Sequence, residues 1–331
     1  MHFYCEKCKK KYPLNTLTYH CSCGGLFKLY KTAEDIIPSS ISIGEIKTPM
    51  LAVNFDDFGK VFLKLEHLQT TGSFKARGAY ALINELKYLG ISHIVEDSSG
   101  NSGAAISAYA AAAGIDCDIY VPKGIAESRV KFMKTFGTHV HYADNRIEAG
   151  KAARRAAEKI YYASHIYNPL FFEGIKTLAY EIYEQMGNKV PEYIFVPVGN
   201  GTILLGLYYG FEEIGRLPAF VAVQSESCSP VYSRFKHRKL QPESYTIASA
   251  IRIMHPKRIN EILMILQRSL GNVVTVSDDE IHNAQLAIGR KGIYVEESAA
   301  CSLAGALKFF KKGKPDNYRI VLPLTGAGLL S

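Results

Sequence analysis

The chain has 331 residues, of which 47% are hydrophobic and 21% are charged. This composition is typical of a globular protein with one large domain or two smaller ones, and it excludes collagen-like, disulfide-stapled and disordered chains. The formal net charge of +8 suits an anionic substrate or cofactor, although it also suits weak contact with nucleic acid. No apolar run is long enough for a transmembrane helix, and the first residues lack the layout of a signal peptide. We therefore expect a cytoplasmic protein without a membrane partner.

Four of the seven cysteines fall within the first 23 residues. They form two short pairs separated by twelve residues, namely Cys5, Cys8, Cys21 and Cys23. Two such pairs can close a tetrahedral thiolate site, which suits Zn²⁺. The pattern predicts a zinc ribbon over residues 1–30, within an N-terminal segment that ends at residue 38. The alternatives are disulfides, which are rare in cytosolic proteins, and a site in which His20 replaces one thiolate.

Lysines surround the first cysteine pair of this segment, with Tyr4 and Tyr12 interleaved. Such a pattern could form a nucleic-acid patch. We favour a structural segment with a solvated basic face, because the rest of the chain carries a stronger signal of another kind. The three remaining cysteines lie among apolar or small residues, and we expect Cys117, Cys228 and Cys301 to be buried.

Beyond the ribbon, runs typical of strands alternate with runs typical of helices. The predicted strands cover residues 60–65, 93–96, 117–121, 138–142, 193–198 and 220–224. The predicted helices cover residues 75–88, 103–113 and 127–136, a segment that ends at Tyr161, and a segment that begins at Thr202. This alternation predicts an α/β fold with a mostly parallel sheet.

Polar, glycine-containing loops lie at the ends of predicted strands or the starts of predicted helices, where open α/β sheets bind ligands. The first, Gly72-Ser73-Phe74-Lys75, places a lysine at a helix start. The positive end of the helix dipole disfavours the ammonium form there, which helps a lysine that acts as nucleophile or base. An ordinary lysine in a first helical turn is the alternative, because such placements are common and their effect is weak.

Two further loops offer backbone N–H groups to an anion. Ser98-Ser99-Gly100-Asn101-Ser102-Gly103 could grip a carboxylate, or it could be an ordinary capped turn. Gly199-Asn200-Gly201-Thr202 follows an apolar strand, and its glycines allow close approach of the backbone to a phosphate. It fits neither the Walker loop nor the dinucleotide fingerprint, although Glu226 at the end of the next strand leaves a dinucleotide enzyme as a rival.

Taken in order with Leu324-Thr325-Gly326-Ala327-Gly328, these loops resemble those of fold-type II enzymes that use pyridoxal 5'-phosphate (PLP). The resemblance runs from about Gly44 to the C-terminus. Within that class the chain looks most like the threonine synthases. The segments that point there are the ribbon, Gly44-Glu45-x-x-Thr48-Pro49, Asn168-Pro169, Glu173-Gly174-x-Lys176-Thr177, Glu296 with Ser302-Leu303-Ala304-Gly305, and the terminal Thr-Gly-x-Gly-Leu.

The resemblance implies a role for each loop. Lys75 would bind the aldehyde of PLP and later move the Cα proton of the substrate as a free amine. Phe74 would lie near the cofactor ring, Asn101 would contact the phenolic oxygen, and Thr325 would face the pyridine nitrogen. The cofactor phosphate would be held by Gly199, Asn200, Gly201 and Thr202. The substrate carboxylate would be bound by Ser98, Ser99 and Ser102.

The implied reaction converts O-phosphohomoserine and water to L-threonine and phosphate. Two residues depart from the threonine synthase pattern. Ala76 stands where those enzymes usually have Asp, and Phe171 stands where an Arg usually helps to bind the substrate phosphate. A phosphorylated substrate would then need other contacts, for which Asn168, Lys176 or Arg77 are candidates.

Two alternatives follow from these departures and from the ribbon. The first is a threonine/serine dehydratase or another PLP enzyme that performs β-elimination or β-replacement. The second is a PLP-fold protein whose ribbon has a binding role, although we do not expect a nucleic-acid partner. The resemblance also implies domains: a PLP-dependent core over 39–331, with a smaller mobile domain at about 87–175 and a larger one formed by 39–86 and 176–331. It further suggests a homodimer that acts on a small amino-acid substrate.

Overall fold

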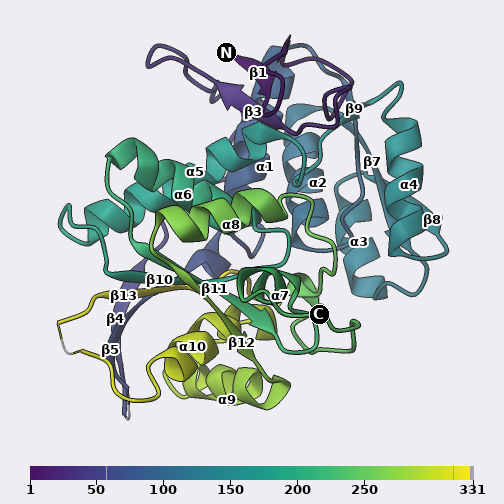
Figure 1. Ribbon diagram of the computed structural model, residues 1–331. Coiled ribbons are helices and arrows are strands. Elements are labelled where there is room, and N and C mark those ends of the chain that lie inside the picture. Colours follow the sequence, from purple (N-terminus) through teal and green to yellow (C-terminus); the bar gives the residue numbers. More distant parts are fainter. Residues whose placement is uncertain (57, 316, 329–331) are drawn as a thin grey trace. The chain divides into compact units, whose positions relative to one another are not determined.

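The computed structural model describes residues 1–56, 58–315 and 317–328, and its chain forms two compact units (Figure 1). Unit 1 contains residues 1–45 and 75–174, and unit 2 contains residues 46–74 and 175–328. The chain therefore passes from unit 2 to unit 1 between Phe74 and Lys75. The mobile smaller domain expected at about 87–175 stays a prediction, because compactness does not test which residues move. Among the described residues, no helix is long and apolar enough to span a membrane.

The larger part of unit 1 is a four-stranded, wholly parallel sheet with helices packed on it. The strand order is β8-β7-β6-β9, with β6 at His93–Glu96, β7 at Asp116–Pro122, β8 at His139–Ala143 and β9 at Tyr161–Tyr162. The helices are α1 (Lys75–Tyr88), α2 (Asn101–Ala113), α3 (Glu127–Thr135) and α4 (Arg146–Ala156). Alanine fills most of α2, and its short side chains let this buried helix approach its neighbours closely.

The remainder of unit 1 is a small antiparallel sheet at the N-terminus. Its strand order is β2-β1-β3, formed by His2–Cys5 (β1), Lys11–Tyr12 (β2) and Phe27–Tyr30 (β3). Phe3 and Phe27 are buried and stack with their ring centroids 5.8 Å apart. This pair gives the segment a small apolar core of its own.

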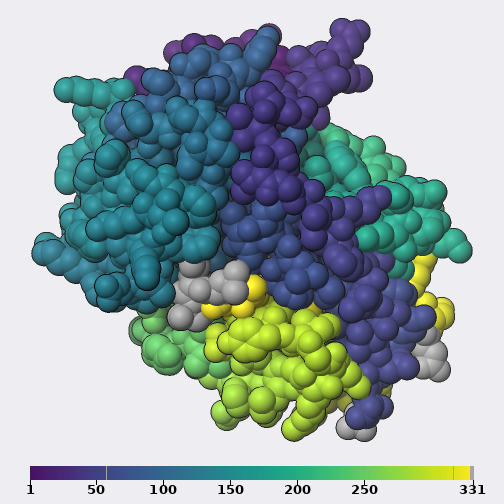
Figure 2. Space-filling model, turned by 180° about the vertical axis from the view of Figure 1, so that it is seen from behind, coloured from purple at the N-terminus to yellow at the C-terminus, as the bar shows by residue number. Residues whose placement is uncertain are grey.

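Unit 2 is built on a six-stranded sheet in the order β12-β11-β10-β13-β5-β4. Its strands are β4 (Met50–Phe55), β5 (Gly59–Lys64), β10 (Tyr193–Pro197), β11 (Ala219–Ser225), β12 (Asn272–Val276) and β13 (Ile320–Pro323). All neighbours are parallel except β4 and β5. The edge strand β4 is exposed or partly exposed except at Phe55, and the blue-violet surface of this part of the chain is visible in Figure 2.

Helices cover both faces of this sheet (Figure 1). On one face lie α6 (Thr202–Ile214) and α8 (Ile259–Arg268), and on the other lie α9 (Asp278–Gly289) and α10 (Glu297–Phe309). The short α7 spans Pro230–Phe235, and α5 (Pro169–Gln185) runs from unit 1 into unit 2. Gly305 allows α10 to approach β11, because an added Cβ would lie 2.4 Å from Val223 Cγ2. The predicted α/β fold with a mostly parallel sheet is confirmed.

One predicted element is wrong. The helix expected to end at Tyr161 stops at Ala156, and Tyr161–Tyr162 instead forms β9 beside β6. Residues 157–160 contain no glycine or proline to mark the stop. The two tyrosines are extended because they pair with Ile94 and Val95 of a strand more than sixty residues earlier, and no local pattern records such a partner.

Candidate active site

Lys75 is the first residue of α1 and lies beside a buried phenyl ring. Its Nζ is 5.7 Å from the ring centroid of Phe171, which is wholly buried. The ring packs on Gly78, where an added Cβ would lie 2.3 Å from two ring carbons. No acidic residue occupies the first turn of α1. The lysine predicted to be reactive is itself partly exposed, and an apolar ring contributed by α5 lies on one side of it.

Unit 1 also contains a buried pair of an acid and an imidazole, and the imidazole packs on the same phenyl ring as Lys75. Glu96 ends β6, and its Oε1 is 2.5 Å from His165 Nδ1. The His165 ring in turn contacts Phe171, with centroids 6.1 Å apart. Burial raises the pKa of Glu96 well above its ordinary value and lowers the pKa of His165 well below its own. The sequence reasoning above missed this pair, because 69 residues separate its members.

The loop before α2 leaves the helix N-terminus open. Gly100 is the N-cap residue, and no described side chain caps the helix. The Ser98 carbonyl group lies close against the first turn of α2. Only glycine fits at position 103, because an added Cβ there would lie 2.1 Å from the Ser98 carbonyl oxygen. The Ser98 hydroxyl accepts a weak hydrogen bond from the Gly100 N–H at 3.4 Å. The backbone N–H groups of this first turn can bind an anion such as a carboxylate.

The glycine loop before α6 in unit 2 also precedes a helix N-terminus without a described capping side chain. Gly201 is the N-cap at φ +82°, a conformation that favours glycine, and no described side chain caps α6. An added Cβ on Gly201 would lie 2.6 Å from Ile262 Cδ1, and one on Gly199 would lie 2.9 Å from Ile253 Cγ1. The backbone itself therefore lines this turn, and its N–H groups suit a phosphate.

Two neighbouring parallel strands bring the other unit 2 residues to this edge of the sheet. Tyr193 of β10 pairs with Ile320 of β13, so Val198 and Thr325 follow their strands at the same level. The Phe74 N–H donates to the Thr325 carbonyl oxygen at 3.1 Å, which holds the residue before Lys75 against Thr325. The predicted phosphate loop, Thr325 and Phe74 thus share one sheet edge.

Buried polar atoms on the segment before Lys75 lack a partner among the described residues. They are His67 Nδ1, Gln69 Oε1, Thr71 Oγ1 and Ser73 Oγ. Unsatisfied buried polar atoms are rare in folded proteins, and they commonly mark a site for a ligand or water. Together with the uncapped glycine turn of α6, they fit a phosphorylated, polar aromatic cofactor such as PLP.

Two residues considered for the substrate have other partners. Asn168 donates to the Tyr161 hydroxyl at 2.8 Å and accepts from the Leu170 N–H at 3.0 Å, so its side chain organises the start of α5. Lys176 forms an ion pair with Glu213 at 2.6 Å. Glu213 lies at the C-terminal end of α6, about 16 Å along the helix from the glycine turn at Thr202. Their expected contact with the substrate stays a prediction.

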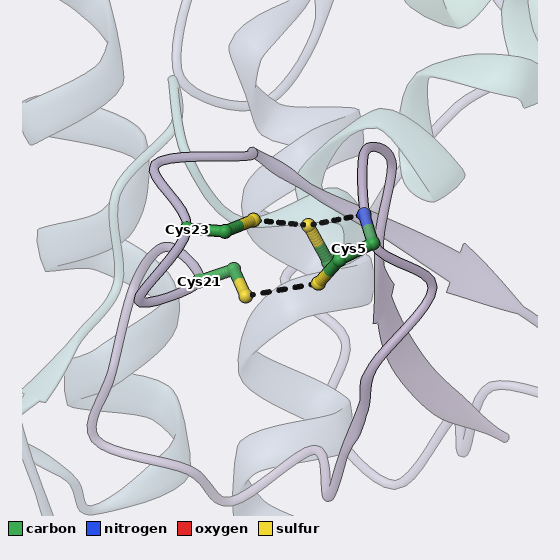
Figure 3. Close-up of side chains that lie close together, drawn as sticks. Cys5, Cys21 and Cys23 are labelled. Atoms are coloured by element: carbon green, nitrogen blue, oxygen red, sulfur yellow. Dashed lines mark hydrogen bonds between the residues drawn. The ribbon is translucent and has the colours of Figure 1, made fainter.

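The four N-terminal cysteines converge, as their spacing predicts. Their sulfur atoms all lie within 4.8 Å of one another, and none forms a disulfide. Cys5 Sγ is 3.4 Å from Cys23 Sγ (Figure 3). Cys8 Sγ is 3.5 Å from Cys21 Sγ. Gly25 is required at the turn, because an added Cβ would lie 2.4 Å from Cys5 Sγ. The His20 ring is not part of this cluster. Four converging sulfurs have the chemistry of a tetrahedral metal site.

The N-terminal segment packs on β9 and on the loop that leads from β9 to α5. The Tyr161 hydroxyl donates to the Leu14 carbonyl oxygen at 3.0 Å. Tyr19 packs edge-on against Tyr162 and Tyr167, with ring centroids 5.3 and 5.0 Å apart. The same loop carries His165 and precedes Phe171, so the cysteine cluster and the surroundings of Lys75 are parts of one packed unit.

Comparison with known proteins agrees with this geometry. The family described as pyridoxal-phosphate dependent enzymes matches residues 41–326. The threonine synthase of Methanocaldococcus jannaschii is 31% identical over 98% of this chain and 92% of its own, and that of Methanosarcina acetivorans is 30% identical over 99% and 92%. A solved threonine deaminase from T.th. has a TM-score of 0.72 and 25% identity, and the match covers 86% of this chain and 93% of its own. The chain is an enzyme that belongs to the pyridoxal-phosphate-dependent family.

Proposed function

We propose that the protein is a PLP-dependent lyase that converts O-phosphohomoserine and water to L-threonine and phosphate. The observation that carries the proposal is a pair of helix N-termini, at Gly100 and Gly201, that are lined by glycine and uncapped by any described side chain. One suits the carboxylate of an amino acid and the other suits the cofactor phosphate. Threonine synthases from two organisms match nearly the whole chain, including the cysteine segment.

Each residue then has a part in binding or in proton transfer. Lys75 would bind the PLP aldehyde, and Asn101 and Thr325 would contact the ring. Residues 199–202 would hold the cofactor phosphate, and Ser98, Ser99 and Ser102 would bind the substrate carboxylate. Bound PLP draws electrons away from the substrate α-carbon, which makes proton removal and loss of a leaving group possible. The Lys75 amine would remove the α-proton of the substrate and return a proton later in the reaction.

A second candidate is a threonine/serine dehydratase, and Phe171 is the observation that favours it. Threonine synthases usually place an arginine there, and a guanidinium gives a bidentate contact with phosphate that is worth about 1.5–3 kcal/mol. Phe171 is wholly buried beside Lys75 and cannot supply that contact. A substrate without phosphate would then lose its hydroxyl group by β-elimination and give a 2-oxo acid and ammonia.

Product analysis by proton NMR distinguishes the two candidates. The PLP-loaded protein is incubated separately with O-phosphohomoserine and with L-threonine, and a Lys75→Ala variant serves as the blank. We expect threonine and phosphate from the first substrate. Formation of 2-oxobutanoate from threonine, with no product from O-phosphohomoserine, would replace the synthase with the dehydratase. No product from either substrate would contradict both.

We also propose that the cysteine cluster holds a structural Zn²⁺. Replacement of Cys21 by serine removes one of the four sulfurs, and we expect the zinc content measured by elemental analysis to fall from about one ion per chain to almost none. Thermal unfolding should begin at a lower temperature, because the segment packs on Tyr161 and Tyr162. The matched control is Cys228→Ala, a buried cysteine outside the cluster, which should keep its zinc. Equal zinc contents in the two variants would contradict a four-cysteine site.

A further inference from the structure

We propose that Tyr161 is a positioning residue whose hydroxyl ties the N-terminal cysteine segment to the start of α5, and so holds the Phe171 ring beside Lys75. The inference rests on the proposed role of Lys75 as the lysine that binds PLP. All of the residues that carry it belong to unit 1. It gives the cysteine segment a part in placing the reactive lysine, through a series of hydrogen bonds and one ring contact.

The loop between the two cysteine pairs, residues 9–20, is closed by the cysteine cluster. Cys8 precedes the loop and Cys21 follows it, with their sulfur atoms 3.5 Å apart. Holding the two ends of a loop together restricts the residues between them. One of these is Leu14, which is buried, and its carbonyl oxygen accepts a hydrogen bond from the Tyr161 hydroxyl at 3.0 Å. The position of this carbonyl therefore depends on the cysteine cluster.

The Tyr161 hydroxyl has a partner on each side. The residue begins β9 and is only 3% exposed. Its hydroxyl donates to the Leu14 carbonyl oxygen and accepts from the Asn168 side-chain amide at 2.8 Å. Burial raises the pKa of Tyr161 above its ordinary value, so the hydroxyl keeps its proton and remains a donor. One buried hydroxyl thus joins the cysteine segment to Asn168.

Asn168 in turn organises the first turn of α5. Its side-chain oxygen accepts from the Leu170 N–H at 3.0 Å, and its carbonyl oxygen accepts from the Phe171 N–H at 3.2 Å. Its own N–H donates to the Ser164 carbonyl oxygen at 3.0 Å, within the turn between β9 and α5. A residue that binds the first N–H groups of a helix in this way acts as its N-cap. The backbone of Phe171 is therefore held by Asn168.

The Phe171 ring packs against the first turn of α1. An added Cβ on Gly78 would lie 2.3 Å from two of the ring carbons, so the ring occupies the space that a side chain there would need. The ring centroid is 5.7 Å from Lys75 Nζ. A lysine side chain has many rotamers when nothing restrains it, and the ring excludes some of them. A displaced ring would leave the amine in its productive position for less of the time.

The first measurement tests the tie itself. Tyr161→Phe removes the hydroxyl and keeps the ring, so it breaks both hydrogen bonds with little change in packing. Hydrogen exchange of the Leu170 and Phe171 backbone N–H groups is followed in the cofactor-free protein. We expect exchange to become about tenfold faster, because a weakened cap favours local opening of the first turn. Unchanged exchange would overturn the proposal.

The second measurement tests the effect on Lys75. The rate at which cofactor-free protein takes up PLP is followed by absorbance. We expect Tyr161→Phe to slow this uptake by about tenfold, because the amine is less well placed, while the final amount of bound PLP stays the same. A purely structural role would lower the amount bound instead of the rate, and that result would overturn the proposal.

The matched control is Tyr109→Phe. Tyr109 is also a fully buried tyrosine of unit 1, and its hydroxyl donates to Glu45 at 2.5 Å. The Glu45 carboxylate keeps hydrogen bonds from the Ser42 hydroxyl and the Ile43 N–H. We expect this variant to lose stability, since a buried hydrogen bond is removed, but to keep the wild-type rates of exchange and PLP uptake. Equal effects of the two variants would overturn the proposal.

A double-mutant cycle tests whether the tie transmits the state of the cysteine cluster. Cys21→Ser alone should speed the exchange and slow the uptake, because the loop that carries Leu14 is no longer closed. In Tyr161→Phe the tie is already broken, so adding Cys21→Ser should change either rate by no more than about twofold. Independent effects that multiply would overturn the proposal, because the coupling would then follow another contact, such as the ion pair between Lys31 and Glu173.

Two further results keep the test decisive. If Tyr161→Phe does not fold, Cys21→Ser is measured alone, and unchanged exchange at Leu170 and Phe171 would overturn the proposal. The exchange measurement contains no PLP, so it does not depend on the assignment of Lys75. Failure of that assignment is a separate outcome, because it would appear as normal covalent uptake of PLP by Lys75→Ala.

Discussion

Replacement of Lys75 by alanine is expected to abolish the absorbance band of covalently bound PLP and to lower kcat by about 10²–10⁴-fold or more. The variant removes the amine that binds the aldehyde and the base that moves the α-proton. The fold should survive, because alanine is the best helix former and Lys75 is the first residue of α1. The measurements are the absorbance spectrum after dialysis against PLP and the steady-state rate.

Lys87→Ala is the matched control for this variant. Lys87 lies in the last turn of the same helix and is exposed. Its replacement should leave the spectrum and the rate unchanged. A Lys75→Ala protein that keeps the wild-type spectrum would show that another lysine binds the cofactor.

Replacement of Gly201 by alanine is expected to weaken PLP binding by about tenfold or more, equivalent to about 1.4 kcal/mol. The residue has φ +82°, where alanine is strained by about 1–2 kcal/mol. Its Cβ would also lie 2.6 Å from Ile262 Cδ1 and 3.2 Å from Leu205 Cδ1. The turn must therefore move, and its N–H groups would no longer converge on the phosphate. The dissociation constant is measured by titration of cofactor-free protein with PLP.

Gly215→Ala separates strain from loss of the phosphate site. Gly215 is the C-cap of the same helix at φ +86°, and an added Cβ would meet no atom within 4 Å. Gly215→Ala should lose about 1–2 kcal/mol of unfolding free energy in denaturant titrations, since it places alanine in a left-handed conformation. Gly201→Ala should lose at least as much, because its Cβ also meets Ile262. Only Gly201→Ala should weaken PLP binding. Equal PLP affinities in the two variants would contradict the assignment of this turn to the phosphate.

Local signals were strong enough to predict much of the fold. The helix expected at 75–88 has those bounds in the structure, because its apolar positions recur at helical spacing and Gly90 follows it. The strand at 93–96 also matches. The prediction of a helix that ends at Tyr161 was wrong, because Tyr161 and Tyr162 are extended only through their pairing with β6, which no local signal records. Leu329, the last residue of the Thr-Gly-x-Gly-Leu motif, lies outside the described residues.

The site could be predicted only where its chemistry is contained in a short segment. The cysteine pairs and the glycine loops are such segments. In the structure the four cysteine sulfurs lie together, and the helices that follow the two glycine loops, α2 and α6, have no described capping side chain. The pairing of Glu96 with His165 depends on tertiary packing, so neither residue carried a signal. Lys176 and Asn168 matched a family pattern, but that pattern did not reveal Glu213 or the Tyr161 hydroxyl as their partners.

The attachment of PLP to Lys75 is tested most directly by trapping it in the wild-type protein. The PLP-loaded protein is reduced with borohydride and digested, and the modified peptide is located by mass spectrometry. The expected result is a single pyridoxyl adduct on the Lys75 side chain. An adduct on a different lysine, or no adduct in protein that has bound PLP, would contradict the assignment of Lys75 and with it the proposed site.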